Sequence, residues 1–397
     1  MTGVGDGKTP LRFLYLHPLA LPGVEANLVQ TTETCRALAE RGHEVFLIVT
    51  RLKEATAGAN LAPFDVRPHE NLHLVAEPAI RLKNASGSRS WFVRAALLWY
   101  LRGLVRRGRT VLYFRTLKDS RLARFLLTAG RLLRVPVVFE AHKVVQEKRE
   151  DQGFHAGTLR RIRRLEGRVL ARADGVVASH PLLEARLRDG LRPLGPLVVA
   201  PNGVRAADAA GAEREFDAVY AGSLFEWKGV DVCLEAVARQ DGVRLAVVGG
   251  NPPERLEALK EKARALGLGD RVTWFGQRPR AEALEIVGRS RCALVPLDPE
   301  FEEGERYTCP LKMLEAMVRG VVVVAADTPA IRAFVTPDVS ALLYPKGDAA
   351  AMAARIEEAL ADPARAAALA AAGRALALEA SFGARARTLE TFVRGLL

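Results

Sequence analysis

Two lysines stand where they could neutralise the phosphates of a ligand. Lys228 lies in 220–231, a short apolar strand that ends in a tight turn and runs into a helix. Lys312 lies about eighty residues later in 307–315, a second turn that leads into a helix. Free N–H groups and the helix dipole make each helix start favourable for an anion. The two together predict a diphosphate site that needs no metal, and they favour an enzyme that uses a nucleotide sugar.

The first half of the chain predicts the elements that would position such a site. Short apolar segments rich in Val and Leu alternate with amphipathic, helix-like segments. This alternation is typical of a parallel sheet that is covered by helices on both faces. The predicted strands are 11–17, 45–50, 111–114, 135–139, 175–178 and 197–199, and the predicted helices include 26–40, 121–133 and 159–172.

A turn at 201–204 and a polar, Ala-rich linker that runs to about residue 216 separate this half from a second α/β pattern. We therefore expect an N-terminal domain over 1–203 and a C-terminal domain over 204–380, with the helix of 381–397 packing back on the first domain. Open α/β sheets bind ligands at the carboxyl ends of their strands. A ligand should thus lie in a cleft between two doubly wound domains. The predicted strands of the second half are 218–221, 244–248, 272–275, 292–296 and 321–325.

The composition narrows the class of protein. The 397 residues are 49% hydrophobic and 26% charged, which suits two full cores. The four cysteines are scattered without histidine partners at ligand spacing, so neither a zinc site nor a disulfide framework is expected. No signal-peptide pattern and no uncharged apolar run long enough to cross a membrane occur. A cytoplasmic protein is expected, with no metal and no cofactor besides its substrate.

The positive charge is concentrated in the first half. The whole chain carries a net charge of +12, and residues 1–203 contain 33 Lys and Arg against 18 Asp and Glu. The second half is slightly acidic. Such asymmetry suggests an anionic partner for the first half, which could be a phospholipid surface, a phosphorylated acceptor or nucleic acid. An arginine-rich composition with solvated helix faces explains the same charge without a partner.

Eight short motifs occur in an order that resembles the retaining glycosyltransferases of family 4, which have the GT-B fold. The resemblance covers nearly the whole chain and implies two Rossmann-like domains facing across a cleft. It also implies transfer of a sugar from a nucleotide-diphosphate sugar, with UDP favoured, to an acceptor held mainly by the first domain. The motifs are GHEV at 42–45, FEAH at 139–142, RADG at 172–175, PNGV at 201–204, KGVD at 228–231, VVGG at 247–250, RVTWFG at 271–276 and PLKMLEAM at 310–317.

The resemblance carries roles to individual residues. His142 and Lys228 are implied to act at the reacting centre, and Glu315 is implied to hold the ribose hydroxyls of the donor. Pro310 is expected to take the first helical position, with Cys309 as the cap. The residues expected to contact the donor are Gly23, Gly222, Ser223, Lys228, Arg278, Tyr307, Pro310, Leu311, Lys312 and Glu315.

Two positions depart from the family pattern. Ser223 stands where many relatives have an arginine in the turn, so phosphate neutralisation would fall on Lys228, on helix N–H groups, and on Arg278 or Lys312. Tyr307 stands where the first of two paired glutamates is usual. Tyr307 itself could bind the donor sugar, or a carboxylate of the nearby acidic run could do so. That run contains Glu302, Glu303 and Glu305.

Two basic segments of the first half raise the question of a membrane. Segment 90–109 combines Trp91, Phe92 and Trp99 with five arginines, as an interfacial helix does. A second basic surface is expected at 160–168. One interpretation is peripheral docking to the inner face of the membrane, toward a lipid-linked acceptor. The other is a helix that packs on the sheet with its arginines in water.

Two other functions are compatible with parts of the sequence. A GT-B nucleotide-sugar epimerase would use the same donor site and would consume the donor without an acceptor. A nucleic-acid-binding protein would use the basic half. No recognition-helix motif or single-strand platform is recognisable, so nucleic acid is not an expected partner.

Overall fold

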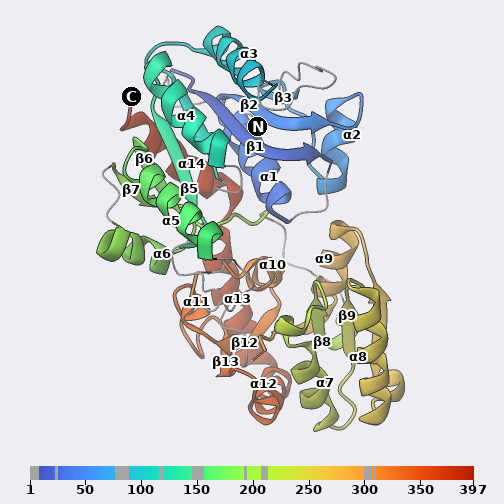
Figure 1. The fold of residues 1–397 in the computed structure, drawn as a ribbon. Helices are drawn as coiled ribbons and strands as arrows, with labels where there is room; N and C mark the ends of the chain where they lie inside the picture. Colours follow the sequence, from blue (N-terminus) through green and yellow to red (C-terminus); the bar gives the residue numbers. More distant parts are fainter. Residues whose placement is uncertain are drawn as a thin grey trace. The chain divides into compact units, whose positions relative to one another are not determined.

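The strands pair into two parallel sheets, one in each of two structural units, in the computed structural model of the chain (Figure 1). The structure describes residues 9–22, 26–76, 89–115, 120–144, 156–191, 195–206, 213–298, 306–307 and 309–397. Unit 1 comprises Met1–Pro201 and Phe382–Leu397, and unit 2 comprises Asn202–Ser381. The predicted α/β class with two doubly wound Rossmann-like sheets is confirmed.

Unit 1 contains a seven-stranded sheet in the order β3-β2-β1-β4-β5-β6-β7. Every residue of β4, β5 and β6 is buried, as expected for parallel strands covered on both faces. The strands are β1 Arg12–Leu21, β2 Glu44–Leu52, β3 Leu72–Ala76, β4 Thr110–Phe114, β5 Val137–Ala141, β6 Gly175–Ala178 and β7 Leu197–Val199. The helices are α1 Ala26–Glu40, α2 Ala57–Leu61, α3 Arg89–Leu104, α4 Ser120–Leu133, α5 Ala156–Leu170, α6 Pro181–Arg186 and α14 Phe382–Arg394.

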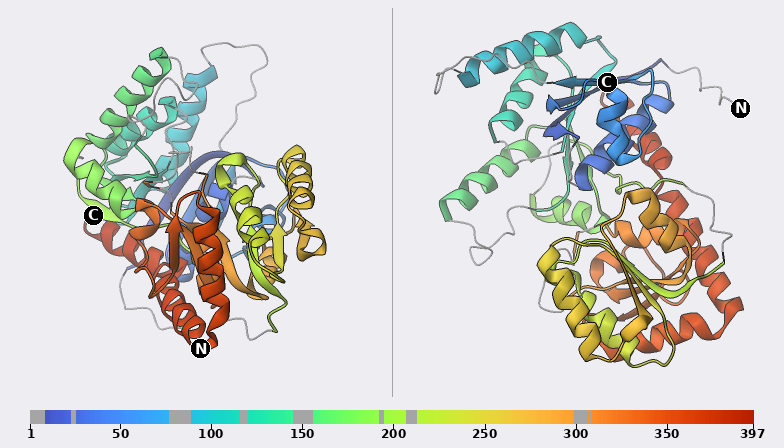
Figure 2. Two further views of the ribbon diagram at one scale, coloured as in Figure 1. Left: turned by 90° about the horizontal axis from the view of Figure 1, so that it is seen from below. Right: turned by 90° about the vertical axis from the view of Figure 1, so that its right-hand side faces the viewer.

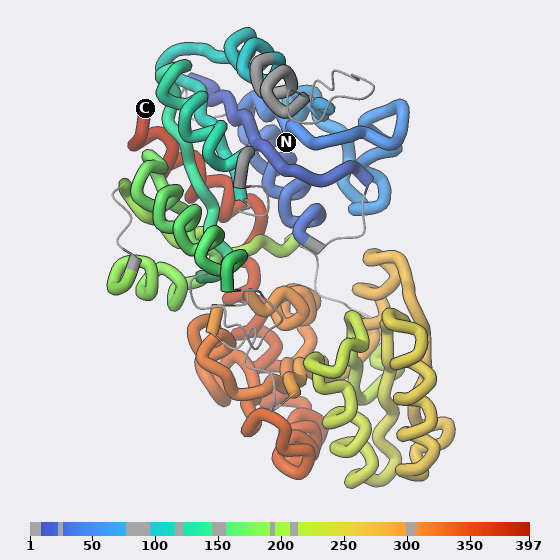
Figure 3. The backbone as a smooth tube through the Cα atoms, viewed as in Figure 1, coloured from blue at the N-terminus to red at the C-terminus, as the bar shows by residue number. Residues whose placement is uncertain are grey.

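The last helix of the chain completes the core of unit 1. Helix α14, red in Figure 3, packs against α1, and the views of Figure 2 show it beside the same sheet. Phe382, Leu389 and Val393 lie in one buried cluster with Leu28 and Leu38 of α1. Apolar burial at this spacing places one face of the helix on the sheet. The other face of the sheet is covered by α3, α4 and α5.

An ion pair between Arg41 and Glu390 also fixes the position of α14. The Arg41 guanidinium donates to Glu390 with its Nε at 2.8 Å, and Arg394 donates to the same carboxylate at 3.0 Å. Burial alone would raise the pKa of Glu390, but these two arginines hold it low, at about 2. The carboxylate is therefore ionised throughout the neutral range.

Unit 2 contains a six-stranded sheet in the order β10-β9-β8-β11-β12-β13. Helices α7, α8 and α12 share a buried cluster with one face of the sheet, and α9, α10 and α13 share a cluster with the other. The strands are β8 Phe216–Ala221, β9 Leu245–Val248, β10 Val272–Gly276, β11 Ser290–Val295, β12 Val322–Asp327 and β13 Leu342–Pro345. The helices are α7 Val230–Ala238, α8 Pro253–Ala265, α9 Arg280–Gly288, α10 Leu311–Val318, α11 Pro329–Arg332, α12 Ala349–Ala361 and α13 Pro363–Glu379.

Two strands were not predicted from the sequence, and both are edge strands. Only Leu72 of β3 is fully buried, and β13 ends at Pro345, which has no N–H to donate. Edge strands need less continuous apolar sequence because one side lies open to water. Among the described residues, no helix is both long and apolar enough to cross a membrane.

Candidate functional site

The two predicted helix starts lie at the topological switch point of unit 2. Strand β8 pairs with β9 on one side and with β11 on the other, so the connections that follow β8 and β11 leave the sheet in opposite directions. A ligand site is expected at this point of an open α/β sheet. The two loops touch there, because the Asp298 N–H donates to the Trp227 carbonyl at 3.2 Å. Gly229, at φ 68°, has no room for a side chain, since a Cβ would lie 2.9 Å from the backbone of Leu297.

Lys228 closes the 3₁₀ turn Glu226–Lys228 immediately before α7. Its Nζ lies 3.5 Å from the centre of the Trp227 ring. No carboxylate of the described residues pairs with it within 4 Å. Partial burial lowers the pKa of Lys228 to about 8. The ammonium is therefore held at the switch point without a counter-ion on the described part of the chain.

Lys312 extends from the first turn of α10 to the end of β8. Its Nζ lies 2.7 Å from the Tyr220 hydroxyl and 4.3 Å from the centre of that ring. A Cβ on Gly222 would stand 2.1 Å from the same Nζ, so glycine is required for this approach. Burial, followed by the charge of Lys228, lowers the pKa of Lys312 to about 7. The structure thus brings two mutually repelling ammonium groups together, an arrangement that an anion would stabilise.

The backbone around the lysines differs in detail from the expectation. Ser223 is held through its carbonyl, which accepts from the Tyr220 hydroxyl. Pro310 is the cap of α10 and does not take the first helical position, so the expectation that Cys309 is the cap is wrong by one residue. The cause is a tight local turn in which the Leu311 N–H donates to the Cys309 carbonyl at 2.9 Å.

Glu315 faces an arginine that the sequence did not single out. The Arg280 guanidinium at the start of α9 donates to Glu315 Oε1 from Nη2 at 2.6 Å and from Nε at 3.2 Å. Both side chains remain partly exposed. Arg278, which was expected to contact a phosphate, is exposed and lies in the segment before α9. The only sequence signal for Arg280 was its place at the start of the helix that follows β10.

The other residues predicted to contact the donor are Tyr307 and Gly23, together with the acidic run that could take the place of Tyr307. Tyr307 is half-buried and lies just before the cap of α10. Gly23 and the acidic run Glu302, Glu303 and Glu305 lie outside the described residues. The structure therefore brings together Gly222, Ser223, Lys228, Pro310, Leu311, Lys312 and Glu315, all in the loops and helix starts at one edge of the unit 2 sheet.

His142 lies in unit 1, directly after β5, where the sheet ends. Its Nε2 is 2.8 Å from Oε1 of Glu140, and a quarter of the side chain is exposed. Burial and the Arg115 guanidinium lower the pKa of His142, although Glu140 opposes them. The imidazole is neutral at pH 7, and its Nε2 faces the Glu140 carboxylate.

Glu140 is a fully buried carboxylate that holds several groups of unit 1 together. Arg385 of α14 lies 2.7 Å from its Oε2, which also accepts from the Tyr113 hydroxyl. Arg115 lies 4.0 Å from Oε1. Burial alone would raise the pKa of Glu140, but Arg385 and then Arg115 hold it well below its usual range. A buried charge this well paired fixes the orientation of His142.

Arg115 marks the switch point of unit 1, and the sequence analysis missed it. It follows β4, the strand that neighbours β1, and it donates to α1 at the Asn27 carbonyl at 3.2 Å and at Thr31 Oγ1 at 3.0 Å. Its side chain is 5% exposed. A single arginine after a strand gives no sequence signal; only the strand order shows that it stands beside His142.

The depressed lysine pKa values predict that a diphosphate bound beside these lysines takes up protons on binding, and UDP serves as the probe. Between about pH 7 and pH 9, free Lys312 and Lys228 lose their protons, whereas a bound diphosphate favours their charged forms. Affinity should therefore fall as the pH rises through this window, in which the phosphates keep their charge. Calorimetric titration of UDP at pH 8 in Tris and in HEPES measures the uptake as a buffer-dependent enthalpy. Lys312→Arg, which stays protonated, should reduce the uptake, and a buffer-independent enthalpy for the unmodified protein would contradict the prediction.

Both halves of the chain match models of known protein families. Residues 28–203 match the family described as "Glycosyl transferase 4-like domain", and residues 207–376 match "Glycosyl transferases group 1". The two matched ranges correspond to the bulk of unit 1 and of unit 2.

Curated proteins and solved structures are similar to the chain over different lengths. It is 29% identical over 289 residues to D-inositol 3-phosphate glycosyltransferase of Segniliparus rotundus, a match that covers 67% of this chain and 62% of that protein. Sucrose-phosphate synthase of Thermosynechococcus elongatus has the same fold, with a TM-score of 0.69, 20% identity, and coverage of 97% of this chain and 99% of that one. HepE of Anabaena in complex with UDP-glucose also has a TM-score of 0.69, with 17% identity and coverage of 96% and 99%.

Proposed function

We propose that this chain, which is built from the two domains of a GT-B glycosyltransferase, transfers a sugar from a UDP-sugar to an anionic acceptor with retention of the anomeric configuration. The observation that carries the proposal is the pair of ammonium groups, Lys228 and Lys312, at the switch point of unit 2. UDP is favoured as the donor nucleotide because HepE, a protein of the same fold, binds UDP and UDP-glucose.

The two lysines would act on the leaving group. Negative charge grows on the diphosphate as the bond to the sugar breaks, so fixed cations beside it stabilise the transition state more than the ground state. These cations would supply the charge that a metal ion supplies in other phosphate sites, which is the basis for proposing a metal-independent reaction. Glu315 would accept from the ribose hydroxyls once donor binding displaces Arg280 from one of its oxygens.

Retention would follow from attack on the face that the diphosphate leaves. The oxygen of the departing phosphate would take the acceptor proton, the acceptor oxygen would bond to the anomeric carbon, and that carbon would release UDP. His142, neutral and oriented by Glu140, would form a hydrogen bond with a hydroxyl of the substrate. An inverted anomer in the product, seen by NMR, would exclude this course.

The acceptor is proposed to carry phosphate or another anionic group. The first unit is strongly basic, and the Segniliparus relative bears the name of an enzyme that acts on D-inositol 3-phosphate. A lipid-linked acceptor at the inner face of the membrane is the other form of this proposal. Its support is Trp99 of α3, which is 78% exposed beside the exposed Arg102. A cytoplasmic location is supported by Cys35, Cys233 and Cys292, which are buried and form no disulfide.

A ligand screen tests the nucleotide. UDP at a hundredfold excess over its dissociation constant should stabilise unit 2 by about 2.7 kcal/mol, which raises the melting temperature by roughly 5 °C or more. ADP and GDP should give smaller shifts, and added EDTA should not alter the UDP shift. The expected result is a UDP shift that is absent in Lys228→Ala/Lys312→Ala. A shift that survives this double substitution would remove the basis of the proposal.

NMR of the UDP-sugar then separates a transferase from an epimerase of the same fold. Without an acceptor, a transferase leaves the donor intact apart from slow hydrolysis, whereas an epimerase changes the sugar. Formation of an epimerised sugar under these conditions would favour the epimerase.

A further inference from the structure

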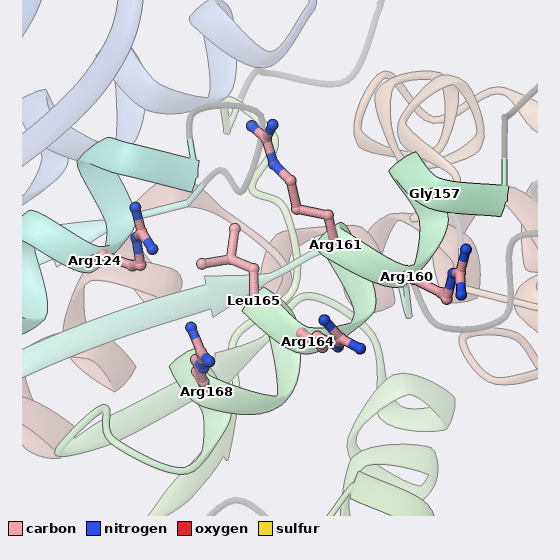
Figure 4. A pocket seen from close by; sticks show the side chains of 7 residues that line it. All are labelled: Arg124, Gly157, Arg160, Arg161, Arg164, Leu165 and Arg168. Atoms are coloured by element: carbon pink, nitrogen blue, oxygen red, sulfur yellow. The ribbon is translucent and has the colours of Figure 1, made fainter. Parts of the chain in front are cut away.

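A hollow lined by arginines lies between α4 and α5 of unit 1, outside the donor site described above. Its volume is about 660 Å³. Figure 4 shows Arg124 of α4 opposite Arg161 and Arg168 of α5, with the Leu165 side chain between them. The complete lining is Arg124, Gly157, Arg160, Arg161, Arg164, Leu165 and Arg168, hereafter the arginine pocket.

The spacing along α5 creates the pocket. Residues 157, 161, 164, 165 and 168 recur every three or four positions, so they share one side of the helix. Gly157 leaves this side open at the start of the helix, because a Cβ there would meet nothing within 4 Å. Leu165 is buried and forms the floor, while the guanidinium groups rise from it into solvent.

Three arginines of the pocket have no counter-ion on the part of the chain that the structure describes. No carboxylate of the described residues lies within ion-pair distance of Arg124, Arg164 or Arg168. Like charges on one side of a helix disfavour the helix. Guanidinium groups that line one hollow from two helices offer several N–H donors to phosphate oxygens (Figure 4).

The position of the pocket connects it to the proposed reaction. Helices α4 and α5 follow β4 and β5, so their N-terminal halves, which include Arg124 and Arg160, lie toward the carboxyl edge of the sheet. Arg115 and His142 follow the same two strands. The pocket therefore opens beside the edge that carries His142 and extends along α5 away from it.

We propose that the arginine pocket binds a phosphate-bearing, multiply charged part of the acceptor and thereby presents the acceptor hydroxyl at the carboxyl edge of unit 1. This inference rests on the proposed transferase function for the role of the ligand, but not for its binding. The shared chemistry is a phosphate monoester or a chain of phosphates. Its source is either a water-soluble acceptor or the headgroup of a lipid.

The test compares two charge-matched variants of the full chain. Arg124→Gln/Arg164→Gln/Arg168→Gln removes three guanidinium groups from the pocket. Arg51→Gln/Arg67→Gln/Arg131→Gln removes three exposed arginines from β2, the loop before β3 and α4, outside the pocket and outside the basic segment of α3, so the net charge is the same. All six side chains are exposed, and neither variant should lose the fold, which circular dichroism checks.

Calorimetry with tripolyphosphate at physiological salt is the first arm. Saturating UDP is added first, to fill the phosphate site of unit 2. The pocket variant should bind tripolyphosphate roughly tenfold more weakly than the unmodified protein, and the control variant should bind it nearly as well. Flotation with vesicles of phosphatidylcholine containing phosphatidic acid is the second arm. A pocket-specific loss in the first arm identifies a water-soluble source, and a pocket-specific loss in the second identifies a lipid.

Equal losses in both variants would show binding to net charge alone and would overturn the proposal. Absence of binding in both arms would overturn it as well. UDP binding is measured in parallel and should be unchanged in both variants. If UDP fails to bind the unmodified protein while the pocket-specific loss persists, the proposed donor is wrong and the anion pocket stands.

Discussion

Replacing Lys228 by alanine is expected to slow sugar transfer by about 10²–10³-fold, a loss of roughly 3–4 kcal/mol of transition-state stabilisation. The Lys228 ammonium is fixed by the turn and by the Trp227 ring, so it needs little rearrangement when charge forms on the leaving diphosphate. The measurement is release of UDP from the donor identified by the ligand screen, followed by 31P NMR. Water can take the place of the acceptor in this assay, so the acceptor need not be known.

Two control variants show whether the loss of rate is specific to the Lys228 ammonium. Lys260→Ala removes a partly exposed lysine of α8 that, among the described residues, pairs with Glu257, and it should leave the rate unchanged. Lys228→Arg should retain part of the rate, because the charge remains while its shape changes. If Lys228→Ala lowers the rate no more than Lys260→Ala, Lys228 does not act on the leaving group.

Replacing Arg385 by leucine is expected to destabilise unit 1 by about 3–5 kcal/mol, because Glu140 would keep a buried charge without its nearest cation. Arg385 also donates to Thr34 Oγ1 at 3.1 Å and to the Pro201 carbonyl at 2.9 Å, and these contacts would be lost together. The loss is measured by hydrogen exchange of β4 and β5 under increasing urea, which reports on unit 1 without assuming that the whole chain unfolds in one step.

Two further variants separate the charge from the packing. Arg394→Leu removes a partly exposed arginine from the same helix and should cost about 1 kcal/mol or less. Glu140→Gln/Arg385→Leu removes the unpaired charge, so it should be more stable than Arg385→Leu alone. A single Arg385→Leu variant as stable as Arg394→Leu would mean that Glu140 is stabilised by Arg115 and Tyr113 without α14.

The sequence predicted the repeating pattern of this fold better than its polar interior. The helix of 26–40 and the strand of 175–178 were predicted with their observed bounds, because continuous apolar runs and a following Gly42 define them. The strand of 135–139 lies two residues later, at Val137–Ala141. The edge strand β3 was missed because its half-exposed positions weaken the apolar signal, and β13 was missed because its buried run is short and ends at Pro345.

Residue pairs that are distant in sequence explain what was missed in the candidate site. Glu140 and Arg385 meet only because the last helix returns to the first sheet, and Arg280 meets Glu315 only through the order of strands in unit 2. In its local sequence, each of these four residues looks like an ordinary surface charge. Lys228 and Lys312, in contrast, were marked by their own turns, so their local sequence was enough to single them out. Their roles in binding and catalysis stay predictions.

Because α14 returns to unit 1, unit 2 is an insertion in unit 1, which is formed by two separate stretches of the chain. The chain leaves unit 1 at Pro201 and re-enters it at Phe382, and Arg385 contacts the carbonyls of Ala200 and Pro201 across that junction. Within unit 2, the Val204 N–H donates to the Ala380 carbonyl at 3.0 Å, so the two ends of the insertion are also adjacent. Unit 2 could therefore be removed. A short glycine linker from residue 201 to residue 382 should yield unit 1 alone, whereas truncation after residue 201 would also remove α14 and leave the core of unit 1 exposed.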